Sequence, residues 1–161
     1  MVRLLIGVIL LLPTFVWAFQ NEPSGFRRHE WGTPYESMAE TLELVEDSDV
    51  KIYSKPGDKL TFGNAELSAL VYGFYDNKLA LVMMRSKGSA NGQALLKAFE
   101  TEFGYSNNPN IQSERYMWFG LITGIVLSCN SDMSQCTGLL HSVELTGAKL
   151  KADVEKAKQA H

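Results

Sequence analysis

Histidine and cysteine are scarce in this chain of 161 residues, which has three histidines and two cysteines. A protein zinc site takes three or four such ligands at defined spacing, and the sequence has neither a His-Glu-x-x-His segment nor paired cysteine motifs. We therefore expect no metal site and no cofactor. Apart from the terminal His161, the only imidazole candidates are His29, which precedes Glu30, and His141. We expect His29 on an exposed strand edge.

The familiar signatures of catalysis are absent as well. There is no Gly-x-Ser-x-Gly nucleophile elbow and no glycine-rich phosphate loop. Ser142 follows His141, but adjacency in sequence says little about a triad that is assembled in space. No pair of carboxylates is marked out for glycosidase chemistry. The sequence thus assigns no catalytic residue, although a hydrolase whose site is not recognisable in sequence stays open.

Positive charge is also limited, with 15 Lys and Arg against 18 Asp and Glu, and there is no run of basic residues. Nucleic-acid binders carry a basic patch on their surface, so the composition excludes that class. It also gives no reason to expect binding to an anionic membrane surface, which polybasic segments favour.

One apolar run stands out, at the N-terminus. Arg3 precedes the uncharged segment Leu4–Phe15, and Val16-Trp17-Ala18 follows, with small residues at the positions where signal peptidase needs them. These features predict a signal peptide over residues 1–18, cleaved after Ala18. The alternative is a retained anchor, but Pro13 and the shortness of the run argue against a membrane span. No cysteine lies at the cleavage point to carry a lipid. We expect a periplasmic or secreted protein with no membrane span after cleavage.

In an exported chain, an even number of cysteines indicates a disulfide, here between Cys129 and Cys136. The six polar, turn-forming residues between them predict a bridge that closes a small loop between two strands. A redox-active pair is the alternative, but it usually needs Cys-x-x-Cys at the start of a helix.

The stretch Ala65–Ser86 predicts a central hairpin. Strands Glu66–Tyr75 and Lys78–Ser86 flank the turn Asp76-Asn77, in which Asn tolerates positive φ. A two-residue turn would place Phe74 opposite Leu79, Tyr72 opposite Leu81 and Leu70 opposite Met83, with Val71 opposite Val82 and Gly73 opposite Ala80 behind them. Both faces of this hairpin are apolar, so we expect it in the middle of a sheet and covered on both sides, at least in part.

Three segments predict helices. Thr33, Pro34 and Glu36 form a capping box ahead of an apolar stripe, which indicates a helix over Pro34–Glu46. Asn91–Phe103 has apolar residues every four positions, with Ser89 or Asn91 available as cap and Gly104 as terminator. The C-terminal segment predicts a weakly amphipathic surface helix from the spacing of Leu150, Val154 and Ala157.

The remaining segments predict strands separated by turns, and Pro56-Gly57 suits the centre of a type II turn. The expected strands are within Phe26–Gly32 and at Val50–Tyr53, Lys59–Phe62, Ser113–Phe119, Leu121–Ser128 and Cys136–Leu145. Residues 19–25 are expected to be a disordered lead-in and residues 26–161 a single domain. This order of elements predicts an α+β fold in two layers, with helices packed mainly on one face of an antiparallel sheet.

Several segments carry a resemblance: Phe26-Arg27-x-x-x-Trp31-Gly32-Thr33-Pro34, Val71-Tyr72-Gly73-Phe74-Tyr75 and Arg115-Tyr116-Met117-Trp118. With them the chain resembles small exported bacterial proteins of unassigned activity that have a Trp-Gly-Thr-Pro helix entry and a Tyr-x-Phe hairpin. The resemblance implies compartment and fold, and it transfers no catalytic residue. In general shape it is similar to two-layer envelope-assembly lipoproteins and secreted inhibitors, which is analogy at the level of the fold.

Aromatic side chains are the remaining functional indication, because they could line a groove for a sugar or a peptide. Aromatic residues in strands more often fill the core, so both interpretations stay open. The residues concerned are Trp31, Tyr35, Tyr53, Tyr72, Tyr75, Tyr105, Tyr116, Trp118 and Phe119. Two hypotheses follow. The first is a non-catalytic binding or interaction module of the cell envelope, whose partner is an unknown protein or small ligand. The second is an envelope hydrolase.

Overall fold

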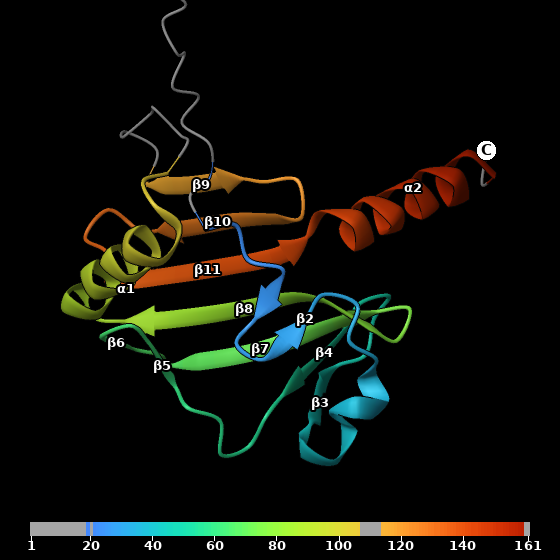
Figure 1. Ribbon diagram of the computed structural model, residues 1–161, viewed down its shortest axis with the longest axis horizontal. Coiled ribbons are helices and arrows are strands. Elements are labelled where there is room, and N and C mark those ends of the chain that lie inside the picture. Colours follow the sequence, from blue (N-terminus) through green and yellow to red (C-terminus); the bar gives the residue numbers. More distant parts are fainter. Residues whose placement is uncertain (1–18, 20, 107–113, 160–161) are drawn as a thin grey trace, which may run out of the picture.

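The computed structural model describes residues 19, 21–106 and 114–159; the predicted signal peptide lies outside them. Seven antiparallel strands form one sheet in the order β3-β4-β7-β8-β11-β10-β9, and β1-β2 and β5-β6 form two small ribbons. The elements are β1 Gly25–Phe26, β2 His29–Glu30, β3 Glu43–Glu46, β4 Lys51–Ser54, β5 Thr61–Phe62, β6 Ala65–Glu66, β7 Ala69–Tyr75, β8 Lys78–Lys87, α1 Ser89–Phe103, β9 Arg115–Phe119, β10 Thr123–Cys129, β11 Gln135–Ser142 and α2 Val143–Gln159. Helix α1 packs against β8 and β11, so the predicted α+β class with a helix on an antiparallel sheet is confirmed (Figure 1).

One face of the large sheet, here called the covered face, carries the hydrophobic core. Side chains from six neighbouring strands form a continuous row on it, and each is at most 8% exposed: Tyr53, Tyr72, Val82, Leu140, Ile125 and Trp118. Helix α1 packs over this row with Leu95, Phe99 and Phe103, which are all buried. Aromatic packing therefore joins the helix to the sheet, with Phe99 and Trp118 ring centroids 5.7 Å apart.

The central hairpin is formed by β7 and β8, and β8 is the middle strand of the seven. Asp76 and Asn77 have φ values of +49° and +59°, as a two-residue turn that matches strand twist requires. Phe74 pairs with Leu79 as predicted. A bulge after Gly73 then shifts the register, so Tyr72 pairs with Val82 and the predicted pairs beyond it are wrong by one residue. The extra residue lets both Leu79 and Val82 reach the buried side, where each is 0% exposed.

The predicted helix over Pro34–Glu46 is wrong. The segment forms two 3-10 turns, Tyr35–Ser37 and Ala39–Thr41, followed by the edge strand β3. Thr33 donates its hydroxyl to Glu30 O instead of capping a helix, and the Glu36 carboxylate accepts from Asn77 Nδ2. Backbone bonds to the end of the β7–β8 hairpin hold the chain extended at Pro34, so tertiary contacts override the local capping pattern.

Both other helices form. Helix α1 begins two residues earlier than predicted and has Gly88 at its N-cap, so neither Ser89 nor Asn91 serves as the cap. It ends at Gly104, whose φ of +83° suits glycine. Helix α2 leaves the end of β11 and projects beyond the sheet, and none of its described residues is buried (Figure 1). In the described residues, neither helix is long and apolar enough to cross a bilayer.

The segment predicted to be a disordered lead-in is held to the sheet over its described residues. The Glu22 carboxylate accepts hydrogen bonds from the backbone N–H of Ile122 and Thr123, at 2.5 and 2.8 Å. Thr123 Oγ1 in turn donates to Pro23 O. The prediction of disorder is therefore wrong for these residues. The segment supplies hydrogen-bond acceptors for backbone N–H groups of the β9–β10 turn, about 100 residues away in sequence, and local composition does not reveal such a contact.

Candidate functional site

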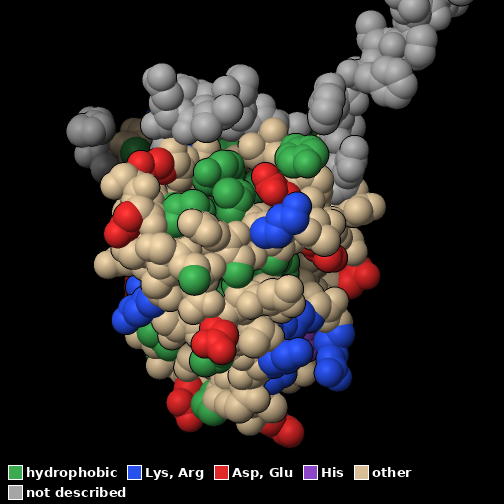
Figure 2. Space-filling view, turned by 90° about the vertical axis from the view of Figure 1, so that its left-hand side faces the viewer, with side chains coloured by type: hydrophobic (Ala, Val, Ile, Leu, Met, Phe, Trp, Pro, Cys, Tyr) green, Lys and Arg blue, Asp and Glu red, His purple; other side chains and the backbone are tan. Residues whose placement is uncertain are grey.

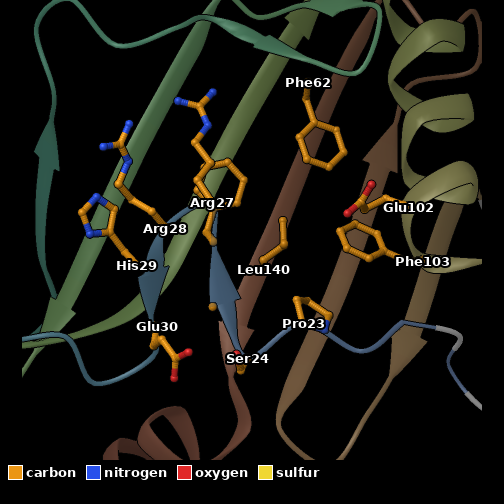
Figure 3. Close-up of a pocket in the computed structure, with 12 residues that line it drawn as sticks. Pro23, Ser24, Arg27, Arg28, His29, Glu30, Phe62, Glu102, Phe103 and Leu140 are labelled. Atoms are coloured by element: carbon orange, nitrogen blue, oxygen red, sulfur yellow. The ribbon is translucent and has the colours of Figure 1, made fainter.

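A pocket of about 440 Å³ lies on the covered face, between the β1–β2 ribbon and the C-terminal end of α1. Figure 3 shows Arg28 and His29 side by side, pointing the same way, with Glu30 pointing away from them and Glu102 on the opposite side. The pocket is lined by both polar and apolar residues: Pro23, Ser24, Gly25, Phe26, Arg27, Arg28, His29, Glu30, Phe62, Glu102, Phe103 and Leu140.

The β1–β2 ribbon is positioned by bonds at both ends. Trp31 N donates to Ser24 O at 2.9 Å, and the Trp31 indole N–H donates to Thr123 Oγ1 at 2.6 Å. Gly25 has to be glycine, because a Cβ there would lie 2.1 Å from His29 O in the paired strand. Arg27 takes a φ of +56° at the turn, which places consecutive basic side chains beside the pocket. The ribbon is thus a fixed platform for Arg27, Arg28 and His29.

Arg27 has a structural role in this platform. Its guanidinium donates to Asp58 Oδ1 at 2.5 Å and to the carbonyl oxygens of Lys59 and Thr61. The other oxygen of Asp58 accepts from the Tyr72 hydroxyl at 2.5 Å. Burial and the Asp58 carboxylate raise the pKa of Tyr72 far above its ordinary value, so the phenol stays protonated and keeps donating. Asp58 therefore neutralises Arg27 and ties the ribbon to β7.

Three other basic groups gather here without such a partner: Arg28, His29 and Lys55, called the basic cluster below. The pKa of His29 lies below its ordinary value, first because of burial and then because of the positive charges of Lys55 and Arg28; nearby Asp58 opposes the shift. Among the described residues, no ion pair involves any of the three. Figure 2 shows Lys and Arg side chains gathered beside a histidine on one side of the molecule.

The second histidine does not join this site. Leu140 lines the pocket, and because alternate residues of a strand point to opposite faces, its neighbour His141 lies on the other face. There His141 Nδ1 lies 3.0 Å from Thr146 Oγ1 of α2, and the ring lies over Gly124. The convergence of His29, Glu30 and His141 that would favour a hydrolase is therefore absent. Across residues 19, 21–106 and 114–159, no three His, Cys, Asp or Glu side chains are arranged to hold a metal ion.

The predicted disulfide is confirmed. Cys129 and Cys136 are bonded and occupy opposite positions in β10 and β11, where the bond closes the end of the hairpin. The bond lies away from the pocket, so its role is structural.

The aromatic residues largely fill the core rather than line a groove. Tyr53, Tyr72 and Trp118 are buried, and Trp31, Tyr35, Tyr75 and Tyr116 are partly buried. Only Tyr105 and Phe119 of the nine candidates are mainly exposed, at 70% and 64%.

Comparison of the chain with protein families, curated proteins and solved structures finds no match. Function therefore has to be argued from the pocket and its charges.

Sequence reasoning missed the basic cluster. Arg28 and His29 are adjacent in the chain, but Lys55 comes from the turn after β4 and comes within electrostatic range of His29 only in the fold. Two consecutive basic residues before a histidine were the only local signal, and alone they do not distinguish a binding site from a solvated strand edge.

Proposed function

We propose that this protein is an exported, non-catalytic binding module of the cell envelope that holds an anionic ligand at the basic cluster. The ligand would present a carboxylate or phosphate group to Arg28, His29 and Lys55 and extend into the adjoining pocket. Export rests on the signal-like N-terminus, and the Cys129–Cys136 bond is compatible with an oxidising compartment.

The observation that carries the proposal is a concentration of positive charge that has no ion-pair partner among the described residues; the nearby Asp58 is already engaged by Arg27 and Tyr72. The chain is acidic, with a formal net charge of −3, yet two cations lie close enough to His29 to lower its pKa. Bringing like charges together costs free energy, and an anion bound between them would remove that cost. Arginine and lysine are also the side chains that best recognise carboxylate and phosphate groups.

The pocket beside the cluster can hold the rest of such a ligand. Its volume of about 440 Å³ falls within the usual range for small-molecule sites. Phe62, Phe103 and Leu140 supply an apolar wall opposite the polar ribbon. A ligand with one anionic group and a small apolar body fits this arrangement.

One observation favours the alternative, an envelope hydrolase. His29 has a lowered pKa and lies in a pocket with acidic groups, as a general base would. Against this, no hydrogen bond joins His29 to a hydroxyl or carboxylate among the described residues, and Glu30 points away from it (Figure 3). A base needs an oriented partner to activate a nucleophile, so binding is the better-supported function.

The test uses inorganic phosphate and citrate as probes. Their binding is followed by the NMR shifts of the His29 ring and by the rise in melting temperature. We expect Arg28→Gln and Lys55→Gln each to weaken binding about tenfold, the loss of one charge-assisted contact. Lys87→Gln is the matched control, since it removes the same charge from an exposed site in β8.

Bound anion should also raise the pKa of His29, because it replaces repulsion by attraction. Equal binding by the wild type and both cluster variants would contradict the proposal. Loss of a hydrolytic activity in His29→Ala, with anion binding unchanged, would favour the enzyme instead.

A further inference from the structure

Glu102 is an acidic side chain that lines the pocket on the side opposite Arg28 and His29. It belongs to the last turn of α1, and Figure 3 shows its carboxylate between the rings of Phe62 and Phe103, directed toward the pocket. Among the described residues this carboxylate has neither an ion pair nor a hydrogen bond. The pocket therefore has an unpaired carboxylate on one side and unpaired basic groups on the other.

Opposite charges on two sides of one pocket fit a zwitterion better than a simple anion. An anion held at Arg28 would face the Glu102 carboxylate across the pocket, and two like charges repel each other. An ammonium group on the ligand turns this repulsion into attraction, because the carboxylate can then accept charge-assisted hydrogen bonds. The charges of the pocket thus complement a ligand that is anionic at one end and cationic at the other.

Apolar side chains line the pocket between its two charged sides. Leu140 lies between them in the view of Figure 3, and Phe62 and Phe103 flank Glu102. Leu140 and Phe103 are 1% and 3% exposed, so both belong to the close-packed core and have little freedom to move. A ligand that reaches both charged sides therefore needs an uncharged body between its own charged groups, with apolar surface to contact these side chains.

A second hollow of about 340 Å³ adjoins the pocket, since Phe62 and Glu102 line both. The side chains that α1 presents there include the small Ala94 and Ala98, and Gly63 lines the hollow from the turn between β5 and β6. A side chain of the ligand next to its ammonium group would enter this hollow. The two hollows together thus offer more room than a single small anion requires.

We infer that the site binds a short peptide with free ends, with the peptide's α-carboxylate at the basic cluster and its α-amino group at Glu102. The inference rests on the proposed function, because it places the anionic group of the ligand at the same cluster. Near neutral pH a peptide carries opposite charges at its two ends, separated by an uncharged backbone and side chains. An apolar side chain in its middle would pack against Phe62 and Leu140.

The test combines variants of the ligand with variants of the protein. The peptide Ala-Leu-Ala with free ends is compared, by titration calorimetry, with its N-acetyl form, which lacks the ammonium group, and with its C-terminal amide, which lacks the carboxylate. We expect the wild type to bind the free peptide about fivefold more tightly than the acetyl peptide, the scale of one exposed ion pair. Glu102→Gln should bind these two peptides equally.

Glu102→Gln should also shift the affinities for peptide and phosphate in opposite directions. It should weaken binding of the free peptide about fivefold and strengthen binding of inorganic phosphate, because it removes an attraction in one case and a repulsion in the other. A damaged fold would weaken both. Glu100→Gln is the matched control, since it removes the same charge from the same helix at a residue that lines neither hollow. It should change neither affinity.

Arg28→Gln separates this inference from the proposed function. It should weaken binding of phosphate, the free peptide and the acetyl peptide about tenfold each, and leave the amide unaffected. Binding of phosphate that depends on Arg28, together with equal binding of the free and acetyl peptides, would overturn the peptide and keep the anion site. Equal effects of Glu100→Gln and Glu102→Gln would also overturn the peptide. If binding of no probe depended on Arg28, the proposed function itself would be wrong.

Discussion

Phe99 of α1 lies directly over Gly138 of β11. A Cβ atom added at position 138 would come within 2.6 Å of Phe99 Cζ and 3.2 Å of Met84 Cγ. The absence of a side chain at this one position lets the helix approach the sheet closely, and the core between α1 and the covered face depends on that approach.

We predict that Gly138→Ala lowers the free energy of unfolding by about 1–3 kcal/mol, the usual cost of overpacking a core. Gly147→Ala is the matched control, since a Cβ there meets nothing within 4 Å. It lies inside α2 and should raise stability by up to about 1 kcal/mol through helix propensity. Urea unfolding checks both. Equal effects of the two substitutions would show that α1 does not rest on Gly138.

The Cys129–Cys136 bond should stabilise the fold by restricting the unfolded chain. Because the loop that it closes is short, we expect a contribution of only about 2–3 kcal/mol. We expect Cys129→Ala/Cys136→Ala to show that loss in urea unfolding. Reductant should lower the stability of the wild type by the same amount and leave the double variant unchanged. A fall in the double variant on adding reductant would contradict this assignment.

Glu22 should hold the β9–β10 turn in place. Its carboxylate accepts from two backbone N–H groups, and Glu22→Ala would leave Ile122 and Thr123 without that acceptor. Because the site is partly exposed, water compensates in part, and we expect a loss of about 1 kcal/mol. Faster hydrogen exchange at the Thr123 amide is the direct readout. Glu43→Ala, an exposed acid in the edge strand β3, should change neither quantity.

Tyr72 should make the free energy of unfolding vary with pH in the alkaline range. Burial and Asp58 raise its pKa in the folded state, so above about pH 10 the unfolded state loses the phenolic proton while the folded state keeps it. The free energy of unfolding should then fall with rising pH, by up to about 1.4 kcal/mol per pH unit. Tyr72→Phe should flatten this decline between pH 10 and 11.5.

Tyr105→Phe is the control for that experiment, because Tyr105 is 70% exposed. It should leave the alkaline slope unchanged. At neutral pH, Tyr72→Phe should cost about 1 kcal/mol for the lost hydrogen bond to Asp58. An alkaline slope identical in wild type and Tyr72→Phe would show that Tyr72 does not hold its proton as proposed.

Local patterns predicted those elements whose contacts are close in sequence. The Asp76-Asn77 turn, the body of α1 and the Cys129–Cys136 hairpin follow from turn chemistry, apolar spacing and cysteine separation. The Thr33 capping box failed because its groups found partners in Glu30 and Asn77 instead. The predicted pairing of β7 with β8 failed for a similar reason. The bulge after Gly73 shifts the register, and what favours the bulge is burial across the whole sheet.

The amino-acid sequence by itself determined the α+β class, the position of the main hairpin and the pairing of the cysteines, because each depends on neighbouring residues. Only the tertiary structure decided the rest. It brought Lys55 beside Arg28 and His29, and it turned Arg27 toward Asp58. It also left the second face of the β7–β8 hairpin only partly covered, with Val71, Leu81 and Met83 partly exposed and α2 in contact with β7. These features join residues distant in the chain, and the burial and charge that link them arise only once the sheet has formed.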